Sequence, residues 1–165
     1  MARWSSFAIQ FAKHIGARVI TTTSAANCDY VRELGADEII DDNAQDFTQV
    51  VTGCDAVFDT VGGDVAQKSF AVLKPGGRAA FIASGAQAPK TNRNDVTSLR
   101  PPVRRARQHL ERIAQLFQAG AIRPPEIKLY RLSEAFLRLS LKWPFCAQLL
   151  ERAVCLIVIM INEPF

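Results

Sequence analysis

Two kinds of hydrophobic pattern alternate along the first part of the chain. Residues 6–15 carry apolar side chains at helical spacing, and Gly16 follows as a helix stop. Residues 17–23 (ARVITTT) then form a β-branched run of strand length. Ser24 is a suitable N-cap for a second helix that reaches residue 34, where Gly35 ends it. The pattern predicts a helix, a strand and another helix.

The same alternation continues to about residue 83. Short strands are predicted over residues 38–40 and 56–59, with a short helix over 47–51 between them. A helix over residues 65–73 is closed by the turn KPGG, and residues 79–83 form the next strand. Strands and helices that alternate through short glycine-rich turns are typical of an α/β protein. We therefore predict a Rossmann-like, doubly wound parallel sheet.

The pattern changes after the last of these strands. Residues 87–102 are predicted as a polar loop and residues 103–119 as a helix, which Gly120 stops. Beyond Pro124 the alternation is lost. An apolar run at residues 153–161, AVCLIVIMI, lies near the end of the tail but is too short for a bilayer, which needs roughly 20 residues. We interpret it as a strand, and divide the chain into a domain of residues 1–123 and a divergent C-terminal tail of residues 124–165.

Composition and charge narrow the function classes. Hydrophobic residues make up 48% of the chain and charged residues 22%, with a net charge of +4, which is ordinary for a soluble α/β protein. The four cysteines form no C-x-x-C pair, and no secretory signal is visible, so we expect a cytoplasmic protein. His14 and His109 lack partners at ligand spacing, and we expect no metal site.

Basic residues gather in the predicted loop and the helix that follows it. Because no aromatic residues are interleaved with them, we interpret this cluster as a solvated surface and expect neither nucleic acid nor a membrane as partner. The cluster comprises Lys90, Arg93, Arg100, Arg104, Arg105, Arg107 and Arg112.

Candidate binding residues follow the predicted strands. In an open parallel sheet, ligands bind beyond the carboxyl ends of the strands, where backbone amides and helix N-termini converge. Four turns of small or polar residues lie at such ends, although turns of this kind also follow strands that bind nothing. The candidates are Thr22, Thr23, Ser24, Asp42, Thr60, Val61, Gly62, Ala83, Ser84 and Gly85.

The end of the strand over residues 17–23 bears on the choice of nucleotide. A carboxylate there would bind the ribose 2′-hydroxyl of NAD and repel the 2′-phosphate of NADP. Thr23 and Ser24 supply hydroxyl groups and no negative charge. This permits NADP and gives it a small advantage, although no arginine or lysine follows at once to hold the phosphate.

Several segments resemble one family in both order and spacing. The chain is similar, over about residues 6–135, to the zinc-independent quinone oxidoreductase branch of the medium-chain dehydrogenases, in the zinc-type alcohol dehydrogenase superfamily. The resemblance implies the NADP(H)-binding Rossmann domain of an enzyme that reduces quinones, enones or related carbonyls by hydride transfer. The segments are FAIQ at residues 7–10, LGAD at 34–37, DTVGG at 59–63 and LKPGGR at 73–78.

The chain also departs from the family pattern. Members enter this domain through a strand and a glycine-rich turn, because the backbone must approach the pyrophosphate closely. Here Ala2-Arg3-Trp4-Ser5 stands at the turn, and the first strand is missing, so we expect weak or lost cofactor binding. Ser5 and Ser6 remain as hydrogen-bond donors at the helix start. Asp42 stands where relatives often have a tyrosine near the cofactor.

The missing strand would be central in the sheet. Its loss leaves two strand edges exposed, which would favour pairing with another copy of the chain. One hypothesis is that residues 155–161 take the vacant position.

Three functions are weighed. The first is a truncated nucleotide-binding domain of an NADP(H)-dependent oxidoreductase, inactive on its own, with no catalytic residue assignable. The second is a non-catalytic remnant or accessory protein that pairs with a full-length relative. The third is a methyltransferase that uses S-adenosylmethionine, against which Thr23-Ser24 argues because that class needs an acidic residue there.

Overall fold

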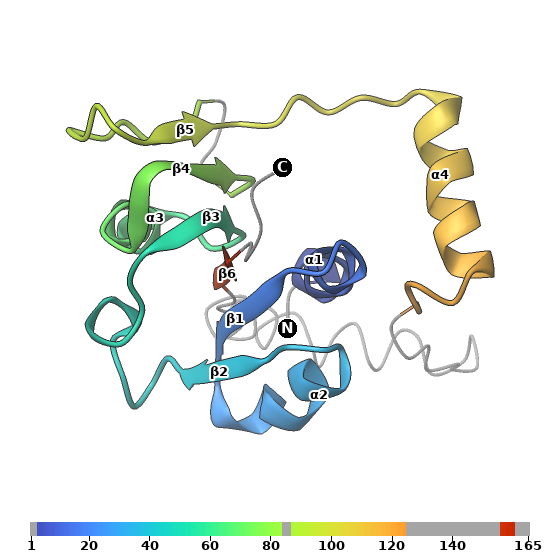
Figure 1. Ribbon diagram of the computed structural model, residues 1–165, viewed down its shortest axis with the longest axis horizontal. Coiled ribbons are helices and arrows are strands. Elements are labelled where there is room, and N and C mark those ends of the chain that lie inside the picture. The colour runs from blue at the N-terminus through green and yellow to red at the C-terminus, as the bar shows by residue number, and fades with distance from the viewer. Residues whose placement is uncertain (1–2, 84–86, 125–155, 161–165) are drawn as a thin grey trace, which may run out of the picture.

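The computed structural model describes residues 3–83, 87–124 and 156–160. Six strands form one sheet in the order β2-β1-β6-β3-β4-β5 (Figure 1). The neighbouring pairs β1–β2, β3–β4 and β4–β5 are parallel, so the predicted Rossmann-like α/β fold is confirmed. The strands are β1 (Arg18–Thr23), β2 (Glu38–Asp41), β3 (Cys54–Asp59), β4 (Leu73–Phe81), β5 (Thr97–Leu99) and β6 (Leu156–Met160).

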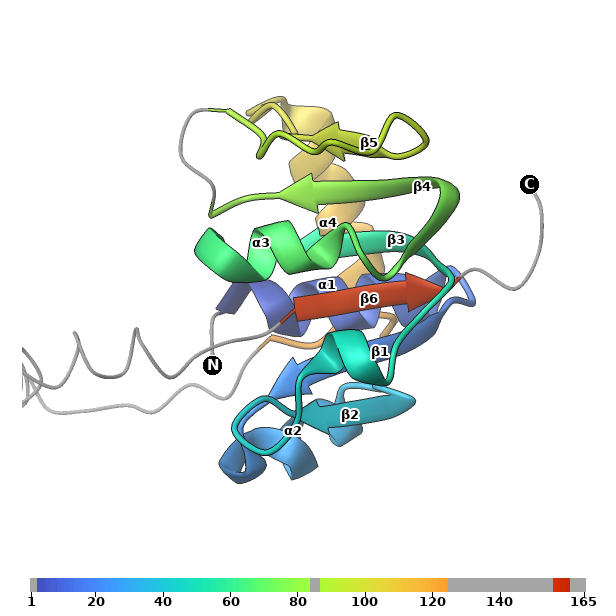
Figure 2. The ribbon, with the colours of Figure 1, turned by 90° about the vertical axis from the view of Figure 1, so that its left-hand side faces the viewer.

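The central position of the sheet is held by β6, from the C-terminal tail. This strand pairs with β1 on one side and β3 on the other, and Val158 is opposite both Ile20 and Val57. Both pairings are antiparallel, as the reversed arrow in Figure 2 shows. The hypothesis that residues 155–161 take the vacant position is confirmed for residues 156–160. The expectation of two exposed edges at β1 and β3 is wrong, because β6 bonds to both.

Helices cover both faces of the sheet (Figure 1). On one face, α1 (Arg3–His14) and α2 (Cys28–Glu33) pack on a core that includes Val19, Val31 and Ile9. On the other face, the 3₁₀ turn η2 (Phe47–Gln49) and α3 (Gly63–Ser69) pack on a core that includes Ile20 and Val57. Neighbours along one strand, such as Val19 and Ile20, therefore enter different cores. This is why the β1 sequence is apolar or β-branched without alternation.

Two predicted element ends are wrong. The second helix does not start from Ser24: a 3₁₀ turn, η1 (Ala25–Asn27), comes first, and the Ser24 hydroxyl accepts a hydrogen bond from the Asn27 amide instead of capping a helix. The predicted helix over 65–73 ends at Ser69. Beyond it, the carbonyl of Val72 accepts from the Cys54 amide, which draws the following residues into β4. The KPGG segment therefore lies within a strand, at a register shift.

The short strand β5 lies in the segment predicted as a loop, and two arginines explain why that segment is ordered. One Arg93 Nη donates to the carbonyls of Phe70 and Leu73, while its other nitrogens bind Asp95. Arg100 donates to the carbonyls of Phe81 and Ile82. These two side chains are structural, so the interpretation of the whole basic cluster as a solvated surface is wrong for Arg93 and Arg100. Within the described residues, no helix is long and apolar enough to cross a membrane.

The last described helix, α4 (Arg107–Gln118), is mostly exposed and contacts α1 through its C-terminal end. The rings of Phe7 and Phe117 meet edge to face, with centroids 6.2 Å apart. Gln10 binds the backbone of Arg123 through both amide atoms, which ties α1 to the segment after α4. Leu110 and Ile113 are exposed, and Leu116 is the buried residue of this helix.

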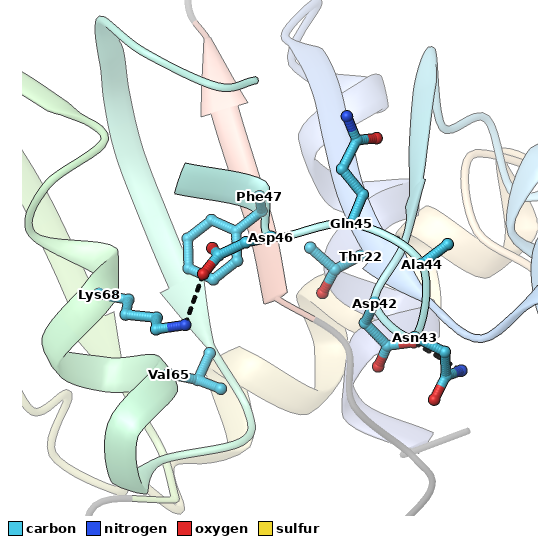
Figure 3. Close-up of a pocket in the computed structure, with 9 residues that line it drawn as sticks. All are labelled: Thr22, Asp42, Asn43, Ala44, Gln45, Asp46, Phe47, Val65 and Lys68. Atoms are coloured by element: carbon cyan, nitrogen blue, oxygen red, sulfur yellow. Dashed lines mark hydrogen bonds and ion pairs between the residues drawn. The ribbon is translucent and has the colours of Figure 1, made fainter. Parts of the chain in front are cut away.

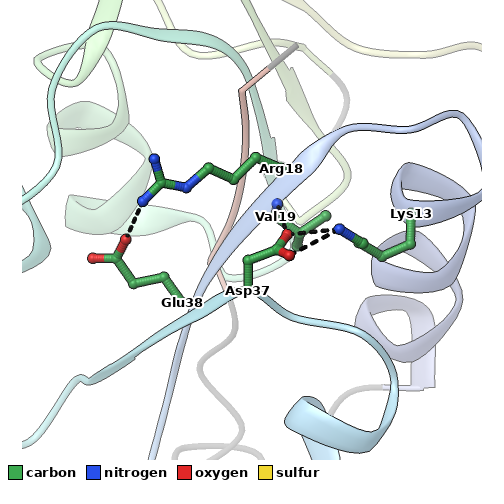
Figure 4. Close-up of polar contacts among 5 residues, drawn as sticks. All are labelled: Lys13, Arg18, Val19, Asp37 and Glu38. Carbon is green, nitrogen blue, oxygen red and sulfur yellow. Dashed lines mark hydrogen bonds and ion pairs between the residues drawn. The ribbon is translucent and has the colours of Figure 1, made fainter. Parts of the chain in front are cut away.

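A polar cluster joins α1 to the start of β1 and β2 (Figure 4). Lys13 Nζ contacts both oxygens of Asp37 at 2.8 and 2.9 Å, and the Val19 amide donates to the same carboxylate at 2.7 Å. Burial acts to raise the pKa of Asp37, but the hydrogen bonds from Lys13 and Val19 outweigh it and hold the pKa below its usual value. Beside it, Arg18 and Glu38 form a more exposed ion pair at 3.0 Å.

Replacing the Asp37 carboxylate tests this cluster. Because the pKa is lowered in the folded state, the carboxylate stabilises the fold above about pH 4 and loses that effect as the pH falls through the folded pKa. We expect Asp37→Asn to lower the free energy of unfolding by about 1 kcal/mol at pH 7. The difference from the unsubstituted protein should shrink below pH ~4. Urea unfolding at both pH values measures this, with Glu38→Gln as a control that costs less than about 0.5 kcal/mol. Equal losses for both variants would contradict it.

The central place of β6 predicts a strong response to proline. Proline at residue 158 removes a backbone donor in the middle of a strand that is paired on both sides, so we expect Val158→Pro to cost at least about 3 kcal/mol. The matched control is Val103→Pro, in an exposed segment outside the helices and strands, which should cost less than about 0.5 kcal/mol. Thermal unfolding distinguishes the two, and comparable midpoints would show that β6 is not needed.

Candidate functional site

A pocket opens at the carboxyl ends of β1 and β2, between these strands and the elements η2 and α3 (Figure 3). Its volume is about 410 Å³. It brings together two predicted binding residues, Thr22 and Asp42. The other residues that line it are Asn43, Ala44, Gln45, Asp46, Phe47, Val65 and Lys68.

Asp42 is fixed against the end of β1. Its backbone amide donates to the carbonyl of Thr23 at 3.2 Å, immediately after the register pair Thr23–Asp41. Burial raises the pKa of the Asp42 carboxyl, and the neighbouring Asp41 carboxylate raises it further. The Asn43 side-chain amide lies 3.3 Å from Asp42 Oδ1, an uncharged partner. The Asp42 carboxylate therefore faces the pocket without a cation beside it among the described residues.

The cation of the pocket, Lys68 on α3, already has a partner. Its Nζ lies 2.6 Å from Asp46 Oδ2. Asp46 also caps η2 by accepting hydrogen bonds from the amide and hydroxyl of Thr48. The hydrogen bond from Lys68, followed by those from Thr48, lowers the pKa of Asp46 to about 2. With Lys68 and Asp46 balancing each other, Asp42 gives the pocket a net negative charge.

A second group of predicted residues lies at the ends of β3 and β4. Asp59 is fully buried, and its Oδ1 accepts from the amides of Val61 and Gly62 at 2.6 and 3.0 Å. Asp59 thus orders the turn that follows β3. Gly62 has φ +81°, and a Cβ there would lie 3.2 Å from the carbonyl oxygen of Ala83. Glycine therefore lets the turn approach the end of β4.

The first turn of α1 meets this second group. Ser5 and Ser6 are both buried, and the Ser5 hydroxyl lies 3.1 Å from the Thr60 hydroxyl. This bond fixes the start of α1 to the end of β3. The two serines were expected as donors to a phosphate, and that role stays a prediction. In this structure the Ser5 hydroxyl already contacts a protein partner.

The predicted residues thus form two groups, and some stand apart from both. Thr23 is buried within β1, and Ser24 is half-buried with its hydroxyl bonded to Asn27. Ser84 and Gly85 lie outside the described residues. Sequence reasoning missed Asp46 and Lys68. The spacing Asp46-x-Thr48 is typical of a capped turn and could have located the first, but the partner on α3 depends on how α3 packs beside η2.

The antiparallel direction of β6 alters the edge of the sheet at which β1 and β3 end. Leu156, the first residue of β6, pairs with Asp59, the last residue of β3. A strand therefore begins at the edge where β1 and β3 end. In a Rossmann domain the central strand would end here and turn into the following helix, which places glycines under the pyrophosphate. The described residues contain no group of three or more His, Cys, Asp or Glu side chains that could hold a metal ion.

Comparisons with known proteins agree on one family. A family model described as zinc-binding dehydrogenase matches residues 5–117. The spectinabilin polyketide synthase system protein NorB of Streptomyces orinoci is 31% identical over 144 residues, which cover 78% of this chain and 6% of that protein. The NADPH-dependent alkenal/one oxidoreductase of Arabidopsis thaliana is 36% identical over 95 residues, which cover 56% of this chain and 24% of that protein.

Comparison with solved structures agrees with this family. The quinone oxidoreductase from Coxiella burnetii superimposes with a TM-score of 0.72 and 27% sequence identity, covering 91% of this chain and 47% of that one. The chain thus spans about half of this structure and a smaller share of the two relatives. The predicted resemblance to the nucleotide-binding domain of quinone oxidoreductase-like medium-chain dehydrogenases is confirmed.

Gly62 offers a test of the turn at the end of β3. Gly62→Ala adds the strain of a positive φ and a contact with the Ala83 carbonyl, so we expect a loss of about 2–3 kcal/mol in the free energy of unfolding. Gly53→Ala is the matched control, because Gly53 also has positive φ but a Cβ there meets nothing within 4 Å. It should cost about 1 kcal/mol. Chemical denaturation measures both, and a Gly62 variant no less stable than the Gly53 variant would contradict the described packing.

Proposed function

Because the chain belongs to the zinc-binding dehydrogenase family, we propose that it is the nucleotide-binding part of an oxidoreductase derived from an NADP(H)-dependent quinone or enone reductase. It binds a nicotinamide dinucleotide at the carboxyl edge of its sheet. The observation that carries this proposal is the pocket at the ends of β1 and β2, which lies where an open α/β sheet binds its nucleotide. The printed names of its relatives, an alkenal/one oxidoreductase and a quinone oxidoreductase, support the reaction class.

The two groups of residues have different parts in this proposal. Thr22 and Asp42, with Thr23 and Ser24 beside them, would hold the adenosine end of the nucleotide. Ser5, Ser6 and the turn from Thr60 to Gly62 would lie under the pyrophosphate. Ala83, Ser84 and Gly85 would lie toward the nicotinamide. The assignment follows the order of strand ends across the sheet, from β1 and β2 to β3 and β4.

In the proposed site, the residues for the adenosine end of the nucleotide are better placed than those for the pyrophosphate. Helix α1 offers its N-terminus, but the Ser5 hydroxyl is bonded to Thr60, and the central strand beside it runs in the opposite direction. Backbone amides that a glycine turn would aim at the phosphates are not supplied by β6 and α1. We therefore propose weak dinucleotide binding and no turnover by this chain alone, with no catalytic residue assigned.

The two alternative functions gain no support. Pairing with a full-length relative was expected from open edges at β1 and β3, and β6 bonds to both. A methyltransferase would need an acidic residue at the end of β1, where Thr23 and Ser24 stand. A cytoplasmic location stays an expectation.

Ligand titration tests the proposal directly. NADPH and NADH fluorescence is followed as each is titrated with the protein, and S-adenosylmethionine is tested by calorimetry as the control ligand. We expect saturable binding of at least one nicotinamide dinucleotide, with a dissociation constant between about 1 μM and 1 mM. S-adenosylmethionine should show no saturable heat. Absence of binding by both dinucleotides, or saturation by S-adenosylmethionine alone, would contradict the proposal.

A further inference from the structure

We infer that Asp42 supplies the ribose-binding carboxylate of this site from the neighbouring strand β2, so that the site selects a 2′-hydroxyl over a 2′-phosphate. This inference rests on the proposed nucleotide site and names the form of the nucleotide that it accepts. In the common arrangement the acidic residue ends the strand that here is β1, and it binds the ribose 2′-hydroxyl of NAD. β1 ends at Thr23 and is followed by Ser24, and neither residue is acidic.

The geometry puts a carboxylate beside that strand end. Asp42 follows β2, the direct parallel neighbour of β1, and its amide is bonded to the Thr23 carbonyl at 3.2 Å. Its side chain lines the same pocket as Thr22 (Figure 3). A ribose bound at the end of β1 therefore meets the Asp42 carboxylate, and the two ribose hydroxyls can donate hydrogen bonds to it.

The charges around the pocket oppose a phosphate. Asp42 lies next to Asp41, whose Oδ1 accepts from the amide of Asn43, so two carboxylates stand at the end of β2. Across the pocket, Lys68 is bonded to Asp46 at 2.6 Å. Among the described residues that line the pocket, Lys68 is the sole cation, and it is already neutralised. A 2′-phosphate would stand against an unbalanced carboxylate, with no free arginine or lysine among the described residues that line the pocket.

The protonation of Asp42 agrees with this role. Burial and the Asp41 carboxylate raise its pKa, so the charged form is poorly stabilised in the free protein. Hydroxyl groups that donate to the carboxylate would stabilise the charged form, whereas a phosphate would destabilise it further. A nucleotide with a free 2′-hydroxyl would therefore stabilise the charged form of Asp42, and a nucleotide with a 2′-phosphate would destabilise it.

The ratio of affinities for NADH and NADPH tests the inference. We expect the unsubstituted protein to bind NADH at least ten times more tightly than NADPH. Asp42→Asn removes the charge with little change in shape. It should weaken the binding of NADH, leave the binding of NADPH unchanged, and so bring the ratio of affinities below three. Glu38→Gln is the matched control, because it removes the same charge from the opposite end of β2, where Glu38 pairs with Arg18 and does not line the pocket. It should change the ratio by less than a factor of three.

The outcomes separate the two proposals. If neither dinucleotide binds the unsubstituted protein, the proposed function and this inference both fail. If both bind but NADPH binds as tightly as NADH, or if Glu38→Gln moves the ratio as far as Asp42→Asn does, only this inference is overturned. Thermal unfolding of each variant verifies folding. Asp42→Ser serves as a second variant with the same expected loss of selectivity.

Discussion

The sheet depends on the pairing of β6 with β1 and β3. Without it the chain holds a two-stranded part, β2–β1, and a three-stranded part, β3–β4–β5, each with an unpaired inner edge. Val19, Ile20 and Thr21 beside that edge are buried, and buried backbone amides and carbonyls without partners are costly. Both hydrophobic cores also continue across the gap, since Phe58 of β3 packs with the β1 core and Ile20 of β1 packs with the β3 core. One strand from the tail thus makes the two parts a single sheet.

Filling the gap with an antiparallel strand has a consequence for function. The hydrogen bonds of the ladder are satisfied in either direction, so an antiparallel strand serves the fold. The ligand edge is different, because Leu156 begins a strand where a Rossmann domain would end one. In the site that we propose, the pyrophosphate would lie beside the start of β6, whereas the pocket at the ends of β1 and β2 lies one strand away.

Most helices and strands before residue 83 follow from local pattern. Residues 17–23 are β-branched and read as a strand, and Gly16 and Gly35 end the helices that flank it. The predictions fail where contacts between residues far apart in the sequence determine the structure. The helix over 65–73 stops at Ser69 because the Val72 carbonyl bonds to Cys54, and β5 exists partly because Arg93 holds the carbonyls of Phe70 and Leu73. The sequence could predict that a run such as LIVIM is a strand, but not its antiparallel direction.

The residues of the candidate site also divide into those that the local sequence predicts and those that depend on contacts between distant residues. Thr22 and Asp42 were predictable because each lies at the carboxyl end of a parallel strand, and these ends share one edge of the sheet. The Lys68–Asp46 pair joins residues 22 positions apart, and no spacing rule indicates it. It nevertheless decides the charge of the pocket, because it leaves Asp42 as the unbalanced group.

Amide hydrogen exchange at residues 156–160 tests most directly whether β6 is the central strand. If it is, the amides of Leu156–Met160 exchange as slowly as those of β1 and β3, since all three open only when the sheet unfolds. Mass spectrometry of peptides from the tail and from both neighbouring strands gives the comparison. Exchange of residues 156–160 at the rate of an unprotected peptide, while β1 and β3 stay protected, would contradict the central position of β6.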